Sequence, residues 1–299
     1  MEQVKKKNIK AHVLMCLLVT CWGFDYVAAK TSLVIMTPMT LLFCKYIQGF
    51  AVMLIIKLAQ RNKNLVRLKD IPFFIACSLV GEILYFNCEY NAMDYMAIPI
   101  VTIMLSLIPV VSILVEWALF KKKPVMGMII GIIICIMGVV LVIGVDFKTL
   151  MSGTMIGYLF CIGAVLSMNV YNFITSSLQK YDAVTLTFTQ MICTLCMITP
   201  VAVHNFPSFS EFTPVIWGSV IWLGVMNSGF GFLVMVYGLK ELGPTISAVY
   251  SNFMPVTSAF FSFMILHEVI APLQVLGGVI VVASGFYVIR EKDKLDRIT

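Results

Sequence analysis

The stretch that decides the fold is YGLKELGPTISAVYSNFMPVTSAFFSFMILHEVIAPLQVLGGVIVVASG, from Tyr237 to Gly285. It contains two apolar runs separated by a short polar turn. The first run carries Pro255 in its middle and stops at His267-Glu268. The second run contains Gly278 and Gly285, seven residues apart. Apolar runs of this length, divided by a polar turn, predict a pair of neighbouring helices that cross a membrane.

An earlier stretch, from Asn91 to Gly138, has the same plan. Pro109 lies inside its first apolar run, KKKP ends that run, and Gly131 and Gly138 are again seven apart. The prolines give an offset of 255 − 109 = 146, and the last glycines one of 285 − 138 = 147. At the same offset of 146, the segment TCWGFDYVAAK, which begins at residue 20, aligns with the segment LSMNVYNFITS, which begins at residue 166. A fixed period indicates a tandem duplication, so we expect two units, residues 1–150 and 151–299.

Composition places these units in lipid. Of the 299 residues, 60% are hydrophobic and 12% are charged, and the mean hydropathy is +0.97. A soluble domain has about 25% charged residues, so a soluble globular protein is excluded. The nine cysteines all lie in apolar runs. Although Cys193 and Cys196 have C-x-x-C spacing, we interpret them as small buried apolar side chains and expect no metal site.

Ten apolar runs have about 20 residues each, the length that crosses a bilayer as a helix. Strands are disfavoured because the runs lack the alternation of a membrane barrel. The predicted fold class is therefore an all-α integral membrane protein with ten transmembrane helices. The predicted spans are His12–Val34, Thr37–Ile56, Pro72–Ala92, Ile98–Phe120, Val125–Val145, Thr154–Ser177, Ala183–Val203, Val215–Leu239, Thr245–Leu266 and Leu273–Ile289.

The distribution of Lys and Arg predicts the orientation. One set of loops and the two termini hold 18 of the 21 basic residues; the other loops hold only Lys148, and Lys30 and Lys45 lie within spans. The positive-inside rule then places both termini in the cytoplasm. Because each unit has five spans, an odd number, the second unit enters from the opposite side. Two inverted five-helix repeats are typical of carriers that work by alternating access, with the substrate site near the midplane.

Several motifs carry a family resemblance. They are Trp22-Gly23 with Lys30 after it, the K-x-L-G-P-T loop at Lys240–Thr245, Pro255, His267-Glu268, and the Gly278/Gly285 spacing. With these motifs the chain resembles the EamA-type family of the drug/metabolite transporter superfamily over essentially its whole length. The resemblance implies a carrier of small solutes, often an exporter of amino acids or other metabolites. Two positions depart from the pattern. Lys122 occupies the position of the first repeat that corresponds to Glu268, and Met168-Asn169 occupy the positions of the second repeat that correspond to Trp22-Gly23.

Charged residues inside the spans are the candidate site. A carboxylate at mid-membrane is costly and normally faces a cavity. Glu82 lies about ten residues, roughly 15 Å, into its span, and we expect it to line a substrate or proton path. Asp25 is either a site residue or half of a structural ion pair with Lys45, which reaches a similar depth. Glu89 shares a helix face with Glu82 and Tyr85, but an interfacial position near the outer end is favoured. Lys30 and Glu268 are expected at outer helix ends.

The second unit offers neutral partners instead. Ser228 matches Glu82, Tyr171 matches Asp25 and Met191 matches Lys45. The predicted cavity therefore has charged side chains on the wall from the first unit and amide and hydroxyl side chains on the wall from the second unit. Such a cavity suits a small polar solute. Aromatic side chains such as Trp22, Tyr85 and Phe86 are able to stack on an apolar group or a cation. The neutral candidates are Asn169, Asn172, Gln190, Asn227, Ser228, Tyr250 and Asn252.

Pro109 and Pro255 are predicted helix kinks at matching positions. Each removes a backbone donor and frees the carbonyl four residues earlier, on Leu105 and Ser251. Such kinks are either flexing points of the two units or static bends set by packing.

Other function classes lack their motifs. His267-Glu268 is not followed by a second His, since position 271 is Ala, and no P-loop or G-x-S-x-G pattern occurs. We therefore predict a transporter and not an enzyme. It is expected to export small polar metabolites such as amino acids through the cell membrane. A multidrug or cation exporter of the same fold is the alternative, followed by an intramembrane enzyme or a receptor. The expected partners are a small solute, lipid and protons, with no nucleic acid and no cofactor; a monomer is compatible with this pattern.

Overall fold

The computed structural model describes residues 2–59, 66–120, 124–143, 154–178, 180–242, 250 and 253–296, and within these ranges it contains helices and turns but no strand. The first half contains α1 (Glu2–Leu33), α2 (Pro38–Ala59), η1 (Leu68–Asp70), α3 (Ile71–Cys77), η2 (Ser78–Leu84), α4 (Tyr85–Tyr95), α5 (Ile98–Leu105), α6 (Ile108–Phe120) and α7 (Met126–Ile143). The second half contains α9 (Thr154–Ser176), α10 (Ala183–His204), η3 (Phe209–Glu211), α11 (Pro214–Ile221), η4 (Trp222–Gly231), α12 (Phe232–Leu242), α14 (Met254–Phe261), η5 (Ser262–Leu266) and α15 (Pro272–Asp296).

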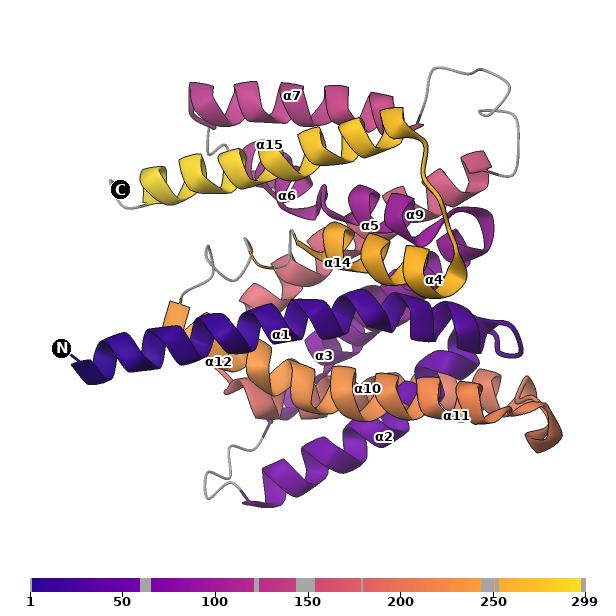
Figure 1. Cartoon of the computed structure of the whole chain (residues 1–299). Helices are drawn as coiled ribbons and strands as arrows, with labels where there is room; N and C mark the ends of the chain where they lie inside the picture. Colours follow the sequence, from indigo (N-terminus) through magenta and orange to yellow (C-terminus); the bar gives the residue numbers. More distant parts are fainter. Residues whose placement is uncertain are drawn as a thin grey trace.

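Eight helical stretches of the described chain are long and apolar enough to cross a membrane, and two shorter apolar helices lie at Met126–Gly138 and Met254–Leu266. Together they overlap all ten predicted spans, so the all-helical membrane fold is confirmed. The start of the ninth predicted span, residues 245–249, lies outside the described residues. The first residues of α1 and the last turn of α15 lie at the same end of the bundle (Figure 1), as an even number of crossings requires.

Two spans change their winding at matching positions. In the third predicted span, α3 passes into the wide turns of the π-helix η2, which continues as α4. In the eighth, α11 passes into the π-helix η4 and then α12. Adding the repeat offset to η2 gives 78 + 146 = 224 and 84 + 146 = 230, both inside η4. Wide helical turns are uncommon and occur mostly at functional sites.

The two proline positions also correspond. Pro109 is the second residue of α6 and Pro255 is the second residue of α14. The fourth span is interrupted just before Pro109, where the Leu107 N–H donates to the Met104 carbonyl at 3.1 Å instead of continuing the α-helical pattern. Proline fits the first turn of a helix because its missing donor is not needed there. Ser251, whose carbonyl Pro255 was predicted to free, lies outside the described residues.

The halves exchange contacts reciprocally. The first span of one half packs against the third and fourth spans of the other: α1 contacts α11, η4, α12 and α14, and α9 contacts α3, η2, α4, α5 and α6. The second spans, α2 and α10, pack on each other, and so do the last spans, α7 and α15. Such reciprocity is what an approximate two-fold relation between two similar units produces.

Small residues allow α7 and α15 to approach closely. A Cβ added to Gly138 would lie 3.0 Å from the Gly277 carbonyl oxygen and 2.9 Å from the side chains of Ile280 and Val281. One glycine of the repeated pair therefore faces the other half of the molecule, as small residues at membrane helix interfaces commonly do.

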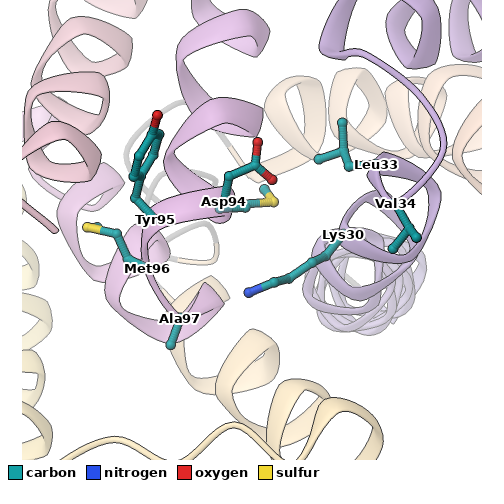
Figure 2. A pocket seen from close by; sticks show the side chains of 8 residues that line it. Lys30, Leu33, Val34, Asp94, Tyr95, Met96 and Ala97 are labelled. Carbon is teal, nitrogen blue, oxygen red and sulfur yellow. The ribbon is translucent and has the colours of Figure 1, made fainter. Parts of the chain in front are cut away.

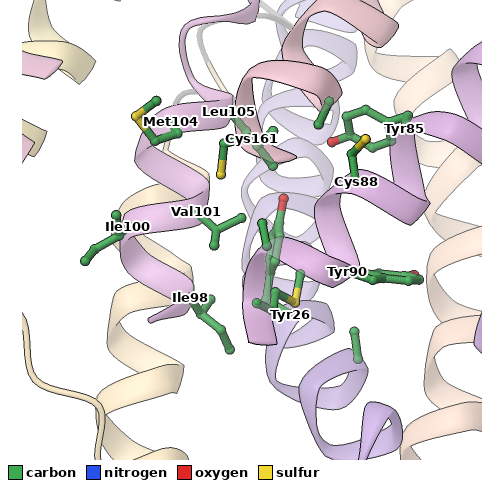
Figure 3. Packing of buried hydrophobic residues seen from close by; sticks show 14 of the residues in the cluster. Tyr26, Tyr85, Cys88, Tyr90, Ile98, Ile100, Val101, Met104, Leu105 and Cys161 are labelled. Atoms are coloured by element: carbon green, nitrogen blue, oxygen red, sulfur yellow. The ribbon is translucent and has the colours of Figure 1, made fainter. Parts of the chain in front are cut away.

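The largest buried cluster lies where α1, α4, α5 and α9 meet. Figure 3 shows Val101 of α5 on the side of α4 that faces Tyr26 of α1, while Tyr90 of α4 points to the other side of its helix. Cys88 and Cys161 are buried in the same cluster as free thiols. This packing holds α1 and α4 in fixed positions, and both helices carry charged residues toward the centre of the bundle.

Candidate functional site

A cavity of about 500 Å³ lies between the halves, and it is lined from the first half by α1, α2, η2 and α4 and from the second by α9, α10, η4, α12 and α14. Pockets of roughly 300–1,000 Å³ are typical of small-molecule sites. Ten of the residues predicted from the sequence line this one cavity: Trp22, Asp25, Lys45, Glu82, Tyr85, Glu89, Asn172, Gln190, Asn227 and Ser228.

Asp25 of α1 is held by the second half. Its Oδ1 accepts from the indole Nε1 of Trp222 at 2.6 Å, and its Oδ2 accepts from the Asn227 amide at 2.5 Å. Both donors lie on η4, whose wide turns carry them to the same face. The carboxylate makes no ion pair with Lys45 within 4.0 Å in the described chain. The predicted Asp25–Lys45 pair is therefore replaced by neutral donors.

Glu89 is buried, with an exposed fraction of 4%, and is not an interfacial side chain. Its Oε1 accepts from the hydroxyls of Tyr26 and Tyr85, each at 3.0 Å. The favoured interfacial interpretation is thus wrong. Depth counted along the helix placed Glu89 near the outer end, but α1 and α9 extend past it and cover it. Neutral hydroxyl donors stabilise a carboxylate that water does not reach.

Glu82 lies in η2, one turn before Tyr85. Its side chain is half-buried, and no residue of the described chain donates a hydrogen bond to it. Lys45 is the nearby cation that acts on it electrostatically. The oxygens of the Glu82 carboxylate are therefore available to accept hydrogen bonds from a ligand in the cavity. Asp25 and Glu89, in contrast, each already accept from two protein donors.

Lys45 of α2 is one of the largest fully buried side chains in the described chain, with an exposed fraction of 2%. Its Nζ lies 3.8 Å from the centroid of the Phe86 ring and 5.9 Å from that of Tyr46. Asp25, Glu82 and Glu89 all attract it over a longer range. An aromatic face attracts a desolvated ammonium by cation–π interaction, so Phe86 holds this charge against the cavity wall.

The second half supplies a neutral polar wall. Three of its buried polar atoms that line the cavity have no hydrogen-bond partner in the described chain: Thr187 Oγ1, Gln190 Nε2 and Ser228 Oγ. Trp22 Nε1 from the first half shares this property. Buried polar groups are normally paired, so unpaired ones that line a cavity are candidates for contact with a ligand.

Two predicted site residues, Asn169 and Tyr250, lie elsewhere, and a third is not among the described residues. Asn169 donates to the carbonyls of Val165 at 2.8 Å and Ile108 at 3.4 Å and does not line the cavity. Tyr250 bonds to His12 Nδ1 at 2.7 Å, away from the charged residues. Asn252 lies outside the described residues. Side-chain polarity alone did not distinguish these positions from those that line the cavity.

Several lining residues were not predicted. Tyr26, Tyr46, Tyr90 and Thr187 line the cavity, and Trp222 orients Asp25. One signal was available for Tyr26, since it directly follows Asp25. Trp222 and Thr187 carried none, because an aromatic residue or a threonine within an apolar run looks like ordinary packing.

A second hollow of about 400 Å³ lies at the end of the bundle where α1 and α4 end. Figure 2 shows Lys30 and Asp94 facing it. Lys30 Nζ forms an ion pair with Glu268 Oε1 at 2.5 Å, and the other oxygen of Glu268 accepts from the Ile98 N–H at 2.9 Å. Glu268 therefore caps α5, a helix of the other half, and lies apart from the large cavity.

Comparison with known proteins adds the family. The sequence profile of the EamA-like transporter family matches residues 9–144 and 155–290, one match in each half. The chain belongs to the EamA-like transporter family. Its predicted membership and its description as a multi-span membrane transporter are thereby confirmed. The matches cover the residues that line the cavity, so the cavity lies between two family units.

Individual relatives are distant but align over nearly full length. An uncharacterized transporter of Archaeoglobus fulgidus is 23% identical over 285 residues, 95% of this chain and all of the relative. The riboflavin transporter ImpX of Fusobacterium nucleatum is 21% identical, covering 93% of this chain and 96% of that protein. A solved crystal structure with 15% identity superposes with a TM-score of 0.66, covering 93% of this chain and 97% of that chain. This last likeness concerns the fold alone.

Proposed function

We propose that this transporter exports small polar metabolites, amino acids or closely related compounds, across the cell membrane by alternating access. The observation that carries the proposal is the cavity between the halves. It combines charged side chains of the first half with neutral polar groups of the second that have no hydrogen-bond partner among the described residues. A site that recognises polar atoms needs such groups in fixed positions. Its volume of about 500 Å³ is in the range of sites that hold one small solute.

The reciprocal packing supports alternating access. Carriers built from inverted repeats hold the substrate at the interface of the repeats and move one unit against the other. Here each wall of the cavity belongs to a different half, so relative movement of the halves changes access to the site. We propose that both termini face the cytoplasm, that the first unit is residues 1–150 and that the second is residues 151–299. Facilitated flux and exchange against protons are the two modes of transport to be distinguished.

The experiment is a counterflow screen in proteoliposomes, with and without a pH gradient. Vesicles loaded with one solute are tested for saturable uptake of the same labelled solute, over the amino acids and related small metabolites. Riboflavin belongs in the screen because one relative is named a riboflavin transporter. Saturable counterflow of an amino acid or related metabolite supports the proposal. No counterflow of any solute contradicts it, and turnover of a substrate without flux favours the enzyme alternative. Efflux from loaded cells tests the direction.

A multidrug or cation exporter is a second candidate, and one observation favours it. Three carboxylates and a single lysine line the cavity, together with the aromatic side chains of Trp22, Tyr85 and Phe86. Carboxylates and aromatic faces both attract organic cations. Counterflow of tetraphenylphosphonium, with none of any amino acid, would favour this candidate.

A further inference from the structure

The charged residues of the cavity fall into two classes. Asp25 accepts from Trp222 and Asn227, and Glu89 accepts from Tyr26 and Tyr85. These two carboxylates are therefore each occupied by two protein donors. Glu82 and Lys45 have no hydrogen-bond or ion-pair partner within the described chain, although both line the cavity.

Lys45 is held without being neutralised. Its ammonium lies on the Phe86 ring, and that ring is fixed by edge contacts with Tyr46 and Tyr85, at centroid distances of 6.4 and 5.0 Å. A ring covers one side of the ammonium and leaves its other N–H groups free. A buried charge without a close counter-ion is unfavourable, so a bound anionic group at this point would stabilise it.

Glu82 is the complementary group. It is near enough to Lys45 for electrostatic attraction, but no ion pair within 4.0 Å joins them. Its backbone belongs to the wide turns of η2, and the adjacent Gly81 lets the ring of Tyr171 from α9 approach closely. Glu82 thus faces the cavity beside the wall of the second half, where Gln190 and Ser228 have unpaired polar atoms.

We propose that Glu82 and Lys45 are the two poles of a zwitterion site. Glu82 binds the ammonium of the substrate, Lys45 binds its carboxylate, and Gln190 and Ser228 contact polar atoms of the remainder. This assignment rests on the proposed transport of small polar metabolites and narrows it to α-amino acids and compounds with the same charge pair.

The two groups without protein partners, Glu82 and Lys45, have opposite charges and therefore favour a zwitterion over a singly charged solute. Asp25 and Glu89 also attract Lys45, but protein donors already hold both. A cation bound at Glu82 would be repelled by Lys45, and an anion bound at Lys45 would be repelled by Glu82. A zwitterion satisfies both groups and adds no net charge to a buried site, which avoids the cost of burying an uncompensated ion.

The test measures binding to the purified full-length protein. Each of the twenty standard L-amino acids is tested singly by its effect on thermal stability. The one that stabilises most is then titrated beside its decarboxylated amine and its deaminated carboxylic acid. The parent protein should bind the amino acid about 10- to 100-fold more tightly than either analogue, as expected for one hydrogen-bonded charge. This comparison needs no variant.

Two variants should then each lose affinity for a different pair of the three probes. Glu82→Gln should weaken binding of the amino acid and the amine about 10- to 100-fold and leave the carboxylic acid unaffected. Lys45→Met should weaken binding of the amino acid and the carboxylic acid and spare the amine. Asp94→Asn is the control for Glu82 and lies 94 − 82 = 12 residues later in the same span. Lys57→Met is the control for Lys45 and lies 57 − 45 = 12 residues later in α2. Both lie outside the large cavity and should bind like the parent.

Three results would overturn the assignment: no stabilisation by any amino acid, equal binding of all three probes by the parent, or loss of all three probes equally in both variants. The proposed function has a separate readout. Counterflow of a singly charged solute would keep the carrier and reject the zwitterion site, whereas absence of all counterflow would reject the carrier itself.

Discussion

Lys30 and Glu268 form an ion pair between the last turns of α1 and the residue pair that follows η5, with 2.5 Å between Nζ and Oε1. The other oxygen of Glu268 accepts from the Ile98 N–H at 2.9 Å and from the Ser262 hydroxyl. His267, beside it, has a left-handed backbone with φ of 56°, which turns the chain so that Glu268 reaches α5. One carboxylate therefore joins α1, α5 and η5 at one end of the bundle.

The first prediction concerns this junction. Glu268→Leu removes the acceptor of three donors and should lower the free energy of unfolding by about 2–3 kcal/mol. Lys30→Met should lower the free energy of unfolding by less than about 1 kcal/mol, because the lysine side chain is 30% exposed. Glu268 keeps its other two donors in this variant. Thermal unfolding in detergent measures both. Lys294→Met, which breaks an exposed pair with Glu291, is the control. Equal costs for the two variants would contradict the three-donor account.

The second prediction concerns close packing between the halves. A Cβ on Gly81 would lie 2.0 Å from Cδ2 of the Tyr171 ring, so Gly81→Ala forces one of them to move. Overpacking of this kind should lower stability by about 1–3 kcal/mol. Gly218→Ala is a matched control in the other half, since no described atom lies within 4 Å of its added Cβ. If both substitutions had the same effect on the unfolding transition, the contact would be unimportant.

The third prediction concerns the support of Asp25. Trp222→Phe removes one donor and leaves a carboxylate oxygen unpaired in the cavity wall, which should cost about 1.5–3 kcal/mol. In an Asp25→Leu background the same substitution should cost much less, because its partner is absent. The double-mutant cycle isolates this coupling. Additive costs would show that the indole contributes by packing and not through Asp25.

The fourth prediction concerns orientation. Ser208, exposed between α10 and α11, should lie outside the cell, and Arg67, exposed before η1, should lie inside. A membrane-impermeant thiol reagent should label Ser208→Cys in intact cells and Arg67→Cys only after permeabilisation. The parent, with its nine native cysteines, gives the background. Labelling of Arg67→Cys alone in intact cells would reverse the predicted orientation.

The fifth prediction concerns transport. Glu82→Gln keeps the size of the side chain, and the matching position of the other half is Ser228, so the fold does not need an acid there. Expression and unfolding temperature should stay near those of the parent, while saturable flux or its dependence on a pH gradient is lost. Should flux and pH profile both match the parent, Asp25 becomes the next residue to substitute.

The sequence predicted the fold well because lipid restricts the choices. Ten apolar runs in two similar sets leave helices as the only structure that satisfies the backbone in a membrane. The same constraint brought Asp25, Lys45 and Glu82 together in the prediction, since charges within spans avoid lipid, whereas Glu89 was favoured as an interfacial residue. Their partners were not predictable. The donors to Asp25 lie on η4, where wide turns break the 3.6-residue period on which helical faces are assigned, and the burial of Glu89 depends on how far α1 and α9 extend beside it.

The sharing of Asp25 between halves has a consequence for the history of the duplication. Asp25 corresponds to Tyr171, while its donors Trp222 and Asn227 correspond to Ala76 and Gly81, since 222 − 146 = 76 and 227 − 146 = 81. The first copy carries the acid and the second carries its donors, so each supplies a part that the other lacks. Two first copies paired together would bury two acids without donors, and two second copies would present donors without an acid. Only a pair of unlike copies completes this contact.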